Sequence, residues 1–325
     1  MLVPVLLFLV GFVLLIKGGD WFVDGSVGIA RRFHLPELLI GATIVSIGTT
    51  LPEVMVSSQA ALQGNAGISY GNAIGSIICN TSLIAAIPVS VSPGKVNPKS
   101  FALPTVFFFG SALSYALVAW TAGSFQRWMG LVYLAVFVVY MVVSTVHMKK
   151  HPELAEEDEE GESDGKPRGF SMELLLLVIG AAAIAVGARL LVDNGTKIAA
   201  ALGVPDSVIG LTMVALGTSL PELITAITSL VKGHGSLSLG NIIGANLFNI
   251  ILVSGMSISL SPFSIPAEKT LPGGLNSSLV IDLPLMLIVM SILCLPALFK
   301  GRLKRWQGIL LLAVYAAFTV YQFAA

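Results

Sequence analysis

Charged residues are scarce in this chain. Asp, Glu, Lys and Arg make up only 11% of its 325 residues, whereas a soluble protein has about 25%. Hydrophobic residues make up 55%, and the mean hydropathy is +0.89. The formal net charge is zero, which gives no support for nucleic-acid binding. The composition predicts an all-α polytopic membrane protein that is surrounded by the lipid bilayer.

Cysteine is also scarce. Cys79 and Cys294 lie inside apolar segments, which predicts packing residues and not a disulfide framework. The apolar run at residues 1–16 lacks a positively charged start and a small-residue cleavage site. We therefore expect a first membrane helix there and not a removed signal peptide. Neither an HExxH nor a nucleophile-elbow motif is present, so the sequence does not predict an enzyme.

Apolar runs of about 17 to 25 residues are long enough to cross a membrane. The sequence predicts ten such spans, in two sets of five. They cover residues 2–22, 36–62, 68–91, 101–120, 128–147, 170–192, 206–231, 236–260, 279–299 and 306–323.

Lys and Arg residues are distributed unequally between the two sides of the predicted spans. One side carries 14 of the 18, and the other side carries Arg127, Arg189, Lys197 and Lys269. By the positive-inside rule, we expect an inner (plasma) membrane protein with both termini extracellular and the central loop cytoplasmic. That loop, residues 148–169, holds eight acidic residues. It predicts a solvated linker, and the alternative of a regulatory cation site lacks an EF-hand pattern.

The two sets of five spans are copies of each other. Aligned without gaps, residues 41–80 and 210–249 agree at 15 of 40 positions. The residue numbers of the two segments differ by one constant shift, which maps Glu53 onto Glu222. We call this shift the repeat displacement. Because each set has an odd number of spans, the second set enters the membrane inverted. Inverted repeats are typical of secondary transporters whose binding site lies near the midplane. The predicted units are residues 1–147, the linker 148–169 and residues 170–325.

Each copy places a carboxylate in the middle of an apolar span. Glu53 ends the segment GTTLPE, and Glu222 ends GTSLPE. An ionisable side chain at this depth costs about 2.5 to 3.5 kcal/mol and usually has a function. No basic residue lies at the same depth, so the neutralising charge has to come from solvent.

A proline precedes each glutamate. Pro52 and Pro221 cannot donate a backbone hydrogen bond, and each disfavours helical geometry in the residue before it. We expect broken helices at the midplane, with an unwound or kinked segment at Gly48 and Thr49 and at residues 217–218. Carbonyl groups freed at this depth have to line a cavity or find another partner, and a bound cation would be such a partner.

Three cations fit such a pocket. Ca²⁺ takes 6 to 8 oxygen ligands, a number that two carboxylates and the oxygens of Thr49 and Thr218 approach. Na⁺ needs less charge per ion and suits neutral oxygens. Those near the glutamates belong to Thr50, Ser76, Asn80, Ser219 and Asn249. Protons are the third possibility, because either glutamate can titrate.

Two pairs of long motifs carry a specific resemblance. GATIVSIGTTLPE with GNAIGSIICN, and GLTMVALGTSLPE with GNIIGANLFN, resemble the two α-repeats of the cation/Ca²⁺ antiporter superfamily, in particular its prokaryotic Na⁺/Ca²⁺ exchangers. The resemblance covers essentially the whole chain. It implies a secondary active antiporter that exchanges Na⁺ for Ca²⁺ by alternating access. The ions would be its cargo, and neither a cofactor nor an obligate protein partner is implied.

The resemblance also implies ligand roles. Glu53, Glu222, Thr49 and Thr218 would bind Ca²⁺. The Na⁺ sites would share both glutamates and add Ser46, Thr50, Ser76, Asn80, Ala215 through its carbonyl, Ser219 and Asn249. The first and sixth helices would slide across the other eight.

The sequence departs from the family pattern at two positions. Ala245 stands where related exchangers often have Ser, which removes the hydroxyl that would match Ser76. Asn249 stands where potassium-dependent members carry Asp, which argues against potassium dependence. A Ca²⁺/H⁺ antiporter is the alternative function, but protons need none of the neutral hydroxyl and amide ligands. A passive cation channel is a further alternative that transport measurements can distinguish.

Overall fold

The computed structural model describes residues 2–151, 154, 169–202, 217–267, 270–271 and 273–324. Within these ranges, eight helical stretches are long and apolar enough to cross a membrane. Two shorter or more polar helices, α12 and α16, stand at the seventh and tenth predicted spans. Residues 206–216 of the seventh predicted span lie outside the described residues. The fold is the expected all-α bundle of ten helices.

The helices and strands of each half follow in chain order. The first half contains α1 (Leu2–Arg32), α2 (Glu37–Ile40), the π-helix η1 (Gly41–Val45), α3 (Ser46–Leu62), α4 (Ala66–Cys79), the π-helix η2 (Asn80–Ala85), α5 (Ala86–Val91), α6 (Pro98–Ala122), β1 (Ser124–Phe125) and α7 (Arg127–Lys150). The second half contains α9 (Phe170–Ala201), α12 (Leu220–Val231), α13 (Gly235–Phe248), the π-helix η4 (Asn249–Ser254), α14 (Gly255–Leu260), β2 (Phe263–Ser264), β3 (Thr270–Leu271), β4 (Leu275–Asn276), the π-helix η5 (Ser278–Asp282), α15 (Leu283–Lys300) and α16 (Arg305–Ala324).

The two halves match element for element around the repeated motifs. The run α4, η2 and α5 covers Ala66–Val91, and the run α13, η4 and α14 covers Gly235–Leu260, so each boundary is shifted by the repeat displacement. The position of the π-turn is the same in both copies as well. The inverted repeat predicted from the sequence is therefore present in the structure down to single helix boundaries.

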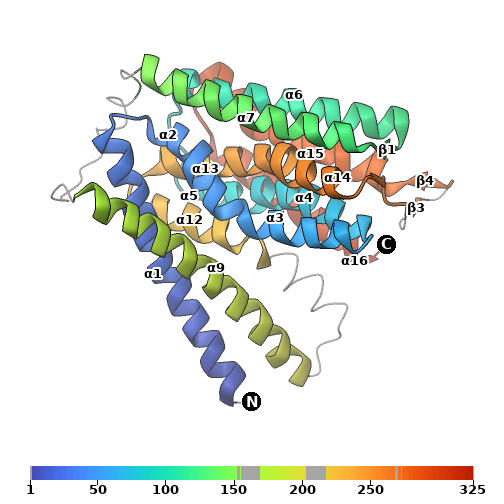
Figure 1. Ribbon diagram of the computed structural model, residues 1–325, viewed down its shortest axis with the longest axis horizontal. Helices are drawn as coiled ribbons and strands as arrows, with labels where there is room; N and C mark the ends of the chain where they lie inside the picture. Colours follow the sequence, from blue (N-terminus) through green and yellow to red (C-terminus); the bar gives the residue numbers. More distant parts are fainter. Residues whose placement is uncertain are drawn as a thin grey trace.

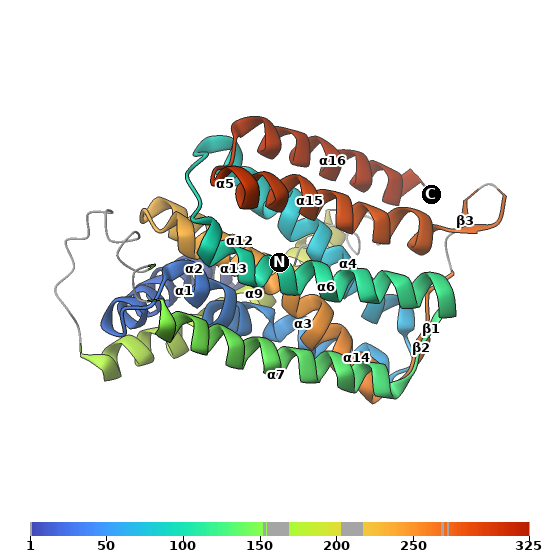
Figure 2. The ribbon, with the colours of Figure 1, turned by 90° about the horizontal axis from the view of Figure 1, so that it is seen from above.

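Local signals in the sequence set several helix ends. Asn65 caps α4 by accepting a hydrogen bond from the backbone N–H of Ile68 at 3.1 Å. Asn97 caps α6 through the N–H of Lys99 at 2.9 Å, and Pro98 occupies the first turn, where it loses no intrahelical bond. Gly123 ends α6 with φ of 64°, a left-handed conformation that glycine adopts without strain. Short strand pairs, β1 with β2 and β3 with β4, close loops at one end of the bundle (Figure 2).

Helices α1 and α9 form a pair that crosses the other helices obliquely (Figure 1). Glycines line their contact. A Cβ atom at Gly11 would lie 2.8 Å from the carbonyl oxygen of Gly187, and one at Gly18 would lie 3.0 Å from that of Gly180. The repeat displacement also relates these glycines, because it maps Gly11 onto Gly180 and Gly18 onto Gly187. The pair is thus a symmetric, close contact between the first helices of the two halves.

Both helices of this pair are longer than predicted. The expected spans ended at residues 22 and 192, whereas α1 continues to Arg32 and α9 to Ala201. In α1 the additional turns are possible because their charges are paired. Arg32 binds Glu173 at 2.7 Å, and Lys232 binds Asp24 at 2.7 Å.

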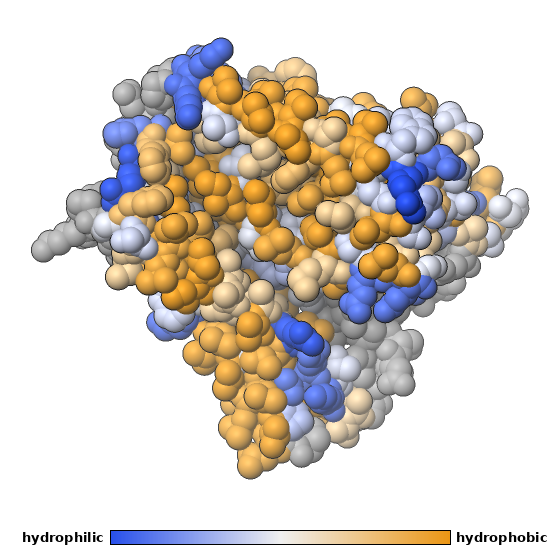
Figure 3. Space-filling model, in the orientation of Figure 1, coloured by the Kyte–Doolittle hydropathy of each residue, from blue (hydrophilic) through white to orange (hydrophobic). Residues whose placement is uncertain are grey.

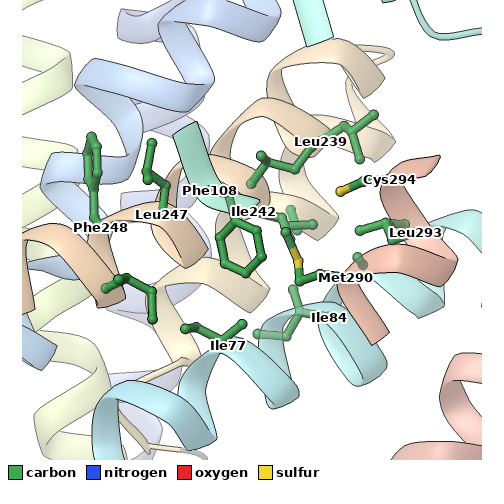
Figure 4. Packing of buried hydrophobic residues seen from close by; sticks show 14 of the residues in the cluster. Ile77, Ile84, Phe108, Leu239, Ile242, Leu247, Phe248, Met290, Leu293 and Cys294 are labelled. Carbon is green, nitrogen blue, oxygen red and sulfur yellow. The ribbon is translucent and has the colours of Figure 1, made fainter. Parts of the chain in front are cut away.

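The core of the bundle surrounds α13. Every residue from Leu237 to Phe248 is buried, and Figure 4 shows Ile242, Leu247 and Phe248 packed among side chains from the neighbouring helices, with Cys294 at the edge of the cluster. Both cysteines are buried free thiols, as predicted. Large apolar side chains cover much of the outer surface (Figure 3), where lipid tails would contact them.

Glycines of the second repeat allow close helix contacts. A Cβ at Gly240 would collide with the backbone of Leu38, and one at Gly244 with Ser46 and Ala42. For Gly71 and Gly75, no atom of the described ranges lies within 4 Å of such a Cβ. The partners that inverted symmetry would give them fall within residues 203–216, outside the described residues.

Candidate cation site

Glu53 and Glu222 lie at the centre of the molecule, on α3 and in the first turn of α12. Both are 0% exposed, and the helices that carry them pack against each other. Within the described part of the chain, none of their four oxygen atoms has a hydrogen-bond partner. Thr218 lies beside Glu53, and Thr49 and Thr50 lie beside Glu222, but none of these hydroxyls has hydrogen-bonding geometry to a carboxylate. Two buried carboxyl groups are left without a partner in the described structure.

The helix breaks differ from those expected. Gly48 and Thr49 lie within α3, which is α-helical from Ser46 to Leu62 with Pro52 inside it, so the expected unwinding there is wrong. The interruption lies one turn earlier, in η1. Carbonyl groups of this segment also accept side-chain hydrogen bonds, because Ser46 Oγ donates to Gly41 at 2.7 Å and Tyr140 Oη donates to Ala42 at 2.8 Å.

The second copy breaks where the sequence predicted. α12 begins at Leu220, with Pro221 in its first turn and Ser219 as the N-cap residue. Thr218 and Ser219 are not helical. A helix N-terminus with a carboxylate in its first turn is electrostatically favourable, which helps to keep Glu222 at this depth.

The two copies exchange hydrogen bonds crosswise. Thr49 Oγ1 donates to Asn241 Oδ1 at 3.1 Å, and Thr218 Oγ1 donates to Asn72 Oδ1 at 3.2 Å. Each bond joins one half to the other, and the repeat displacement maps one bond onto the other. Asn72 Nδ2 also donates to the backbone oxygen of Glu53 at 3.2 Å. The asparagines therefore position the threonines that flank the glutamates.

Our ligand prediction did not include Asn72 and Asn241. Their recurrence in the motif Gly-Asn-x-x-Gly of both copies was the available signal. The sequence could not show that each asparagine contacts the threonine of the opposite copy, because that contact depends on how the halves pack.

The two copies differ in the hydroxyls that the sequence predicts as Na⁺ ligands. Ser76 Oγ and Ser219 Oγ lie 3.5 Å apart, at the limit of a hydrogen bond. The symmetry-related positions carry Thr50 and Ala245, and within the described structure Thr50 Oγ1 has no partner. The departure noted at Ala245 thus leaves a buried hydroxyl unpaired beside Glu222.

Two asparagines begin the π-helical turns. Asn80 is the first residue of η2 and Asn249 the first of η4, and both are 0% exposed. η2 packs against α12 and η4 packs against α3, so each asparagine lies near the glutamate helix of the other copy. In the described ranges, both polar atoms of Asn80 and Oδ1 of Asn249 are unpartnered. π-turns are often found at functional sites.

This arrangement is suited to a hard cation. Orphaned acceptor oxygens from carboxylates, a hydroxyl and amides converge in the described part of the centre, and no cluster of three or more His, Cys, Asp or Glu is found there. Oxygen-only ligation favours Ca²⁺, Mg²⁺ or Na⁺ over transition metals. Of the predicted ligands, only Ala215 lies outside the described residues.

Comparison with known proteins agrees with this geometry. A family model described as "Sodium/calcium exchanger protein" matches residues 3–146 and 172–324. The chain belongs to the sodium/calcium exchanger family. The exchanger family contains transporters, so the chain is a multi-pass membrane transporter and not an enzyme, and exchange transport requires no cofactor.

Individual relatives match along nearly the full length. The chain is 33% identical to the sodium/calcium exchanger MaX1 of Methanosarcina acetivorans over 351 residues, covering 98% of each chain. It is 36% identical to an uncharacterized membrane protein of Methanocaldococcus jannaschii over 312 residues, covering 95% of this chain and 94% of the relative. A solved structure of the sodium-calcium exchanger NCX_Mj, soaked with 2.5 mM Na⁺ and 10 mM Sr²⁺, matches with a TM-score of 0.82 and 33% identity over 97% of both chains.

Proposed function

We propose that this protein exchanges Na⁺ for Ca²⁺ by alternating access, with Glu53 and Glu222 binding both ions in turn. The observation that carries the proposal is the pair of fully buried carboxylates whose oxygens lack hydrogen-bond partners in the described structure. The names of MaX1 and NCX_Mj, which are sodium/calcium exchangers, support this choice of ions.

Ca²⁺ would bind between the two copies. Four carboxylate oxygens and the oxygens of Thr49 and Thr218 reach the 6 to 8 ligands that Ca²⁺ takes. The crosswise bonds from Asn72 and Asn241 fix both threonines. The Na⁺ sites would use the same glutamates with Ser46, Thr50, Ser76, Asn80, Ala215 through its carbonyl, Ser219 and Asn249.

Shared ligands explain obligatory exchange. An empty site would carry two uncompensated carboxylates through a low-dielectric environment, at several kcal/mol for each buried ion. Movement between the two access states is then favourable only when cations are bound. Because Na⁺ and Ca²⁺ neutralise the same charges, each ion leaves before the other binds.

The α1/α9 pair is the moving part in this proposal. Close glycine contacts and the ion pair of Arg32 with Glu173 join the two helices, so they can move together. The pair contacts α12 around Gly19 and through the ion pairs of Lys232. We further propose that both termini are extracellular and that residues 148–169 form a cytoplasmic linker between units 1–147 and 170–325.

Radioactive Ca²⁺ uptake into proteoliposomes tests this function. We expect uptake when the vesicles contain Na⁺, none when they contain K⁺, and loss of uptake with Glu53→Gln. An imposed proton gradient is the third condition. Uptake driven by protons without Na⁺ would contradict Na⁺ coupling, and uptake that continues without any counter-ion would indicate a channel.

A further inference from the structure

Two buried hydroxyls on α12 have no role in the site described above. Thr225 and Ser229 are both 0% exposed, and within the described structure neither side-chain oxygen has a hydrogen-bond partner. Some other buried hydroxyls bond back to the preceding turn, as Thr43 does to Leu39 at 2.6 Å and Thr81 does to Ile77 at 2.7 Å. An unpaired buried hydroxyl costs about 1 to 3 kcal/mol, so two of them on one helix require an explanation.

Both hydroxyls lie on the same face of α12 as Glu222. They follow it by three and seven residues, the spacing that places side chains above one another on a helix. Seven residues advance a helix by about 10 Å. The two hydroxyls therefore form a column, which we call the Thr225/Ser229 column, between the glutamate and the end of α12.

The column ends at the face of the molecule that carries Lys232. Ser229 accepts a backbone hydrogen bond from His234 at 2.7 Å, and the ring of His234 contacts the buried carboxylate of Glu37 at 2.9 Å. Lys232 lies three residues beyond Ser229. It borders a cleft of about 580 Å³ that also contains Asp20 and Asp24.

The α1 helix lies directly beside the column. Ile224 and Thr228 neighbour Thr225 and Ser229 along α12, and both contact Gly19 of α1, where a Cβ would lie 2.7 Å from Ile224. Lys232 then binds α1 at the end of the column, through Asp24 at 2.7 Å and the backbone oxygen of Asp20 at 3.1 Å. The helix that moves in the proposed mechanism therefore borders the Thr225/Ser229 column along the adjacent residues of α12.

The matching helix of the first copy has no such column. The positions that correspond to Thr225 and Ser229 on α3 are Val56 and Ala60. The hydroxyls are therefore not a by-product of the repeated ligand motif, and nothing in the helix geometry requires them, because α3 forms the same helix without them.

We propose that Thr225 and Ser229 line the route by which cations pass between Glu222 and the Lys232 face when α1 moves away. This inference rests on the proposed exchange function. Each hydroxyl would replace part of the hydration shell of a Na⁺ or Ca²⁺ ion along the stretch of about 10 Å that separates the site from that face. The route would be specific to one face of the membrane, because on α3 Val56 and Ala60 carry no hydroxyl and the hydroxyl of Ser57 already accepts a hydrogen bond from Asn72 at 2.8 Å.

Side-specific transport measurements test the column. Everted membrane vesicles present the cytoplasmic face, to which we assign Lys232, and right-side-out vesicles present the opposite face. We would measure initial rates of ⁴⁵Ca²⁺ uptake against external Ca²⁺ for wild type, Thr225→Val and Ser229→Ala. We expect each variant to weaken the apparent Ca²⁺ affinity about five-fold at the Lys232 face, the loss expected for one hydrogen bond, and to leave the opposite face unchanged.

Three controls separate a role in permeation from a role in packing. Thr228→Val makes the same change on the neighbouring face of α12 and should leave both affinities unaltered. Thr225→Ser keeps the hydroxyl and should restore the wild-type value. Glu222→Gln should abolish Na⁺-dependent uptake in both preparations.

The possible failures are distinguishable. If wild type shows no Na⁺-dependent uptake, the exchange function itself is wrong. If wild type exchanges normally, the column is refuted by any of three results: no change in the variants, an equal change at both faces, or a Thr225→Ser variant as impaired as Thr225→Val.

Discussion

The two copies of the repeat have nearly the same scaffold but different side chains where ions would bind and move. α4, η2 and α5 correspond to α13, η4 and α14 residue for residue, and the Thr–Asn bonds occur in both directions. In contrast, Ser76 and Ser219 bring two hydroxyls together, whereas the corresponding positions carry Thr50 and Ala245 and so have only one hydroxyl. The repeat therefore preserves backbone geometry, whereas the ligand set is specified position by position.

The two copies also differ at the ends of the helices that carry Glu53 and Glu222. α12 leads to Lys232, which binds two aspartates of α1, whereas the corresponding residue after α3 is Gln63. On α9, the residues that correspond to Asp20 and Asp24 are Arg189 and Asp193, which pair with each other at the surface. One face of the molecule thus has an interhelical ion pair that the inverted copy does not repeat.

The glutamates provide the strongest test of equivalence between the copies. Glu53→Gln and Glu222→Gln should each lower Na⁺-dependent Ca²⁺ uptake by about 100-fold or more, because removing one member of a buried charged set costs about 3 to 5 kcal/mol. Glu173→Gln, which removes a buried carboxylate bound to Arg32, is the control and should retain exchange. A variant of either central glutamate that keeps a tenth of the wild-type rate would show that the copies contribute unequally.

The crosswise asparagines should have the next largest effect. Asn72→Ala and Asn241→Ala each release one threonine, and outer-shell partners of this kind are worth about 10-fold or more in metal affinity. Calorimetric titration of the purified protein with Ca²⁺ measures the change. Asn72→Ala should also lower the melting temperature more than Asn241→Ala, because Asn72 bonds Ser57 at 2.8 Å as well. If both variants kept the wild-type Ca²⁺ affinity, the threonines would not be Ca²⁺ ligands.

Ala245→Ser would make the copies more alike. The new hydroxyl gives the unpaired oxygen of Thr50 a partner and adds a ligand, so the Na⁺ concentration for half-maximal Ca²⁺ release should fall about two- to five-fold, the value of one hydrogen bond. Ser76→Ala equalises the copies in the opposite direction and should raise that concentration. If both variants shifted this Na⁺ concentration in the same direction, the assignment of these hydroxyls to the Na⁺ sites would be wrong.

The ion pair at Lys232 should have the smallest effect. Its partners are partly exposed, and such pairs contribute at most about 1 kcal/mol. Lys232→Met should therefore alter the maximal exchange rate only a few-fold, by shifting the balance between the two access states. Arg189→Met, at the exposed pair of the other copy, should leave the rate at the wild-type value. An equal response to both substitutions would mean that the pair does not influence this balance.

Much of the fold could be predicted because the repeat is visible in the sequence. The displacement that relates Glu53 to Glu222 also relates their helices, so the predicted spans at 68–91 and 236–260 agree with the observed ones within two residues. The burial of both glutamates at the centre also agrees with prediction, because a carboxylate in an apolar span has few other solutions.

Other features depended on contacts between distant segments. The end of α1 was predicted ten residues too early because Asp24 and Arg32 count against a membrane span until Lys232 and Glu173 are known to bind them. The π-turn at Gly41–Val45 contains no proline. It is stabilised by Ser46 and by Tyr140 of a remote helix, whereas Pro52, the local signal, is accommodated in a regular helix.

The glycine contact of α1 with α9 has a thermodynamic consequence. Gly11 meets Gly187 and Gly18 meets Gly180, so exchanging the two halves reproduces the same contact. This contact by itself therefore favours neither of the two access states that we propose. In the exchange that we propose, the polypeptide does not set the direction of net transport. The ion gradients and the membrane voltage set it, and the same molecule runs in reverse when they reverse.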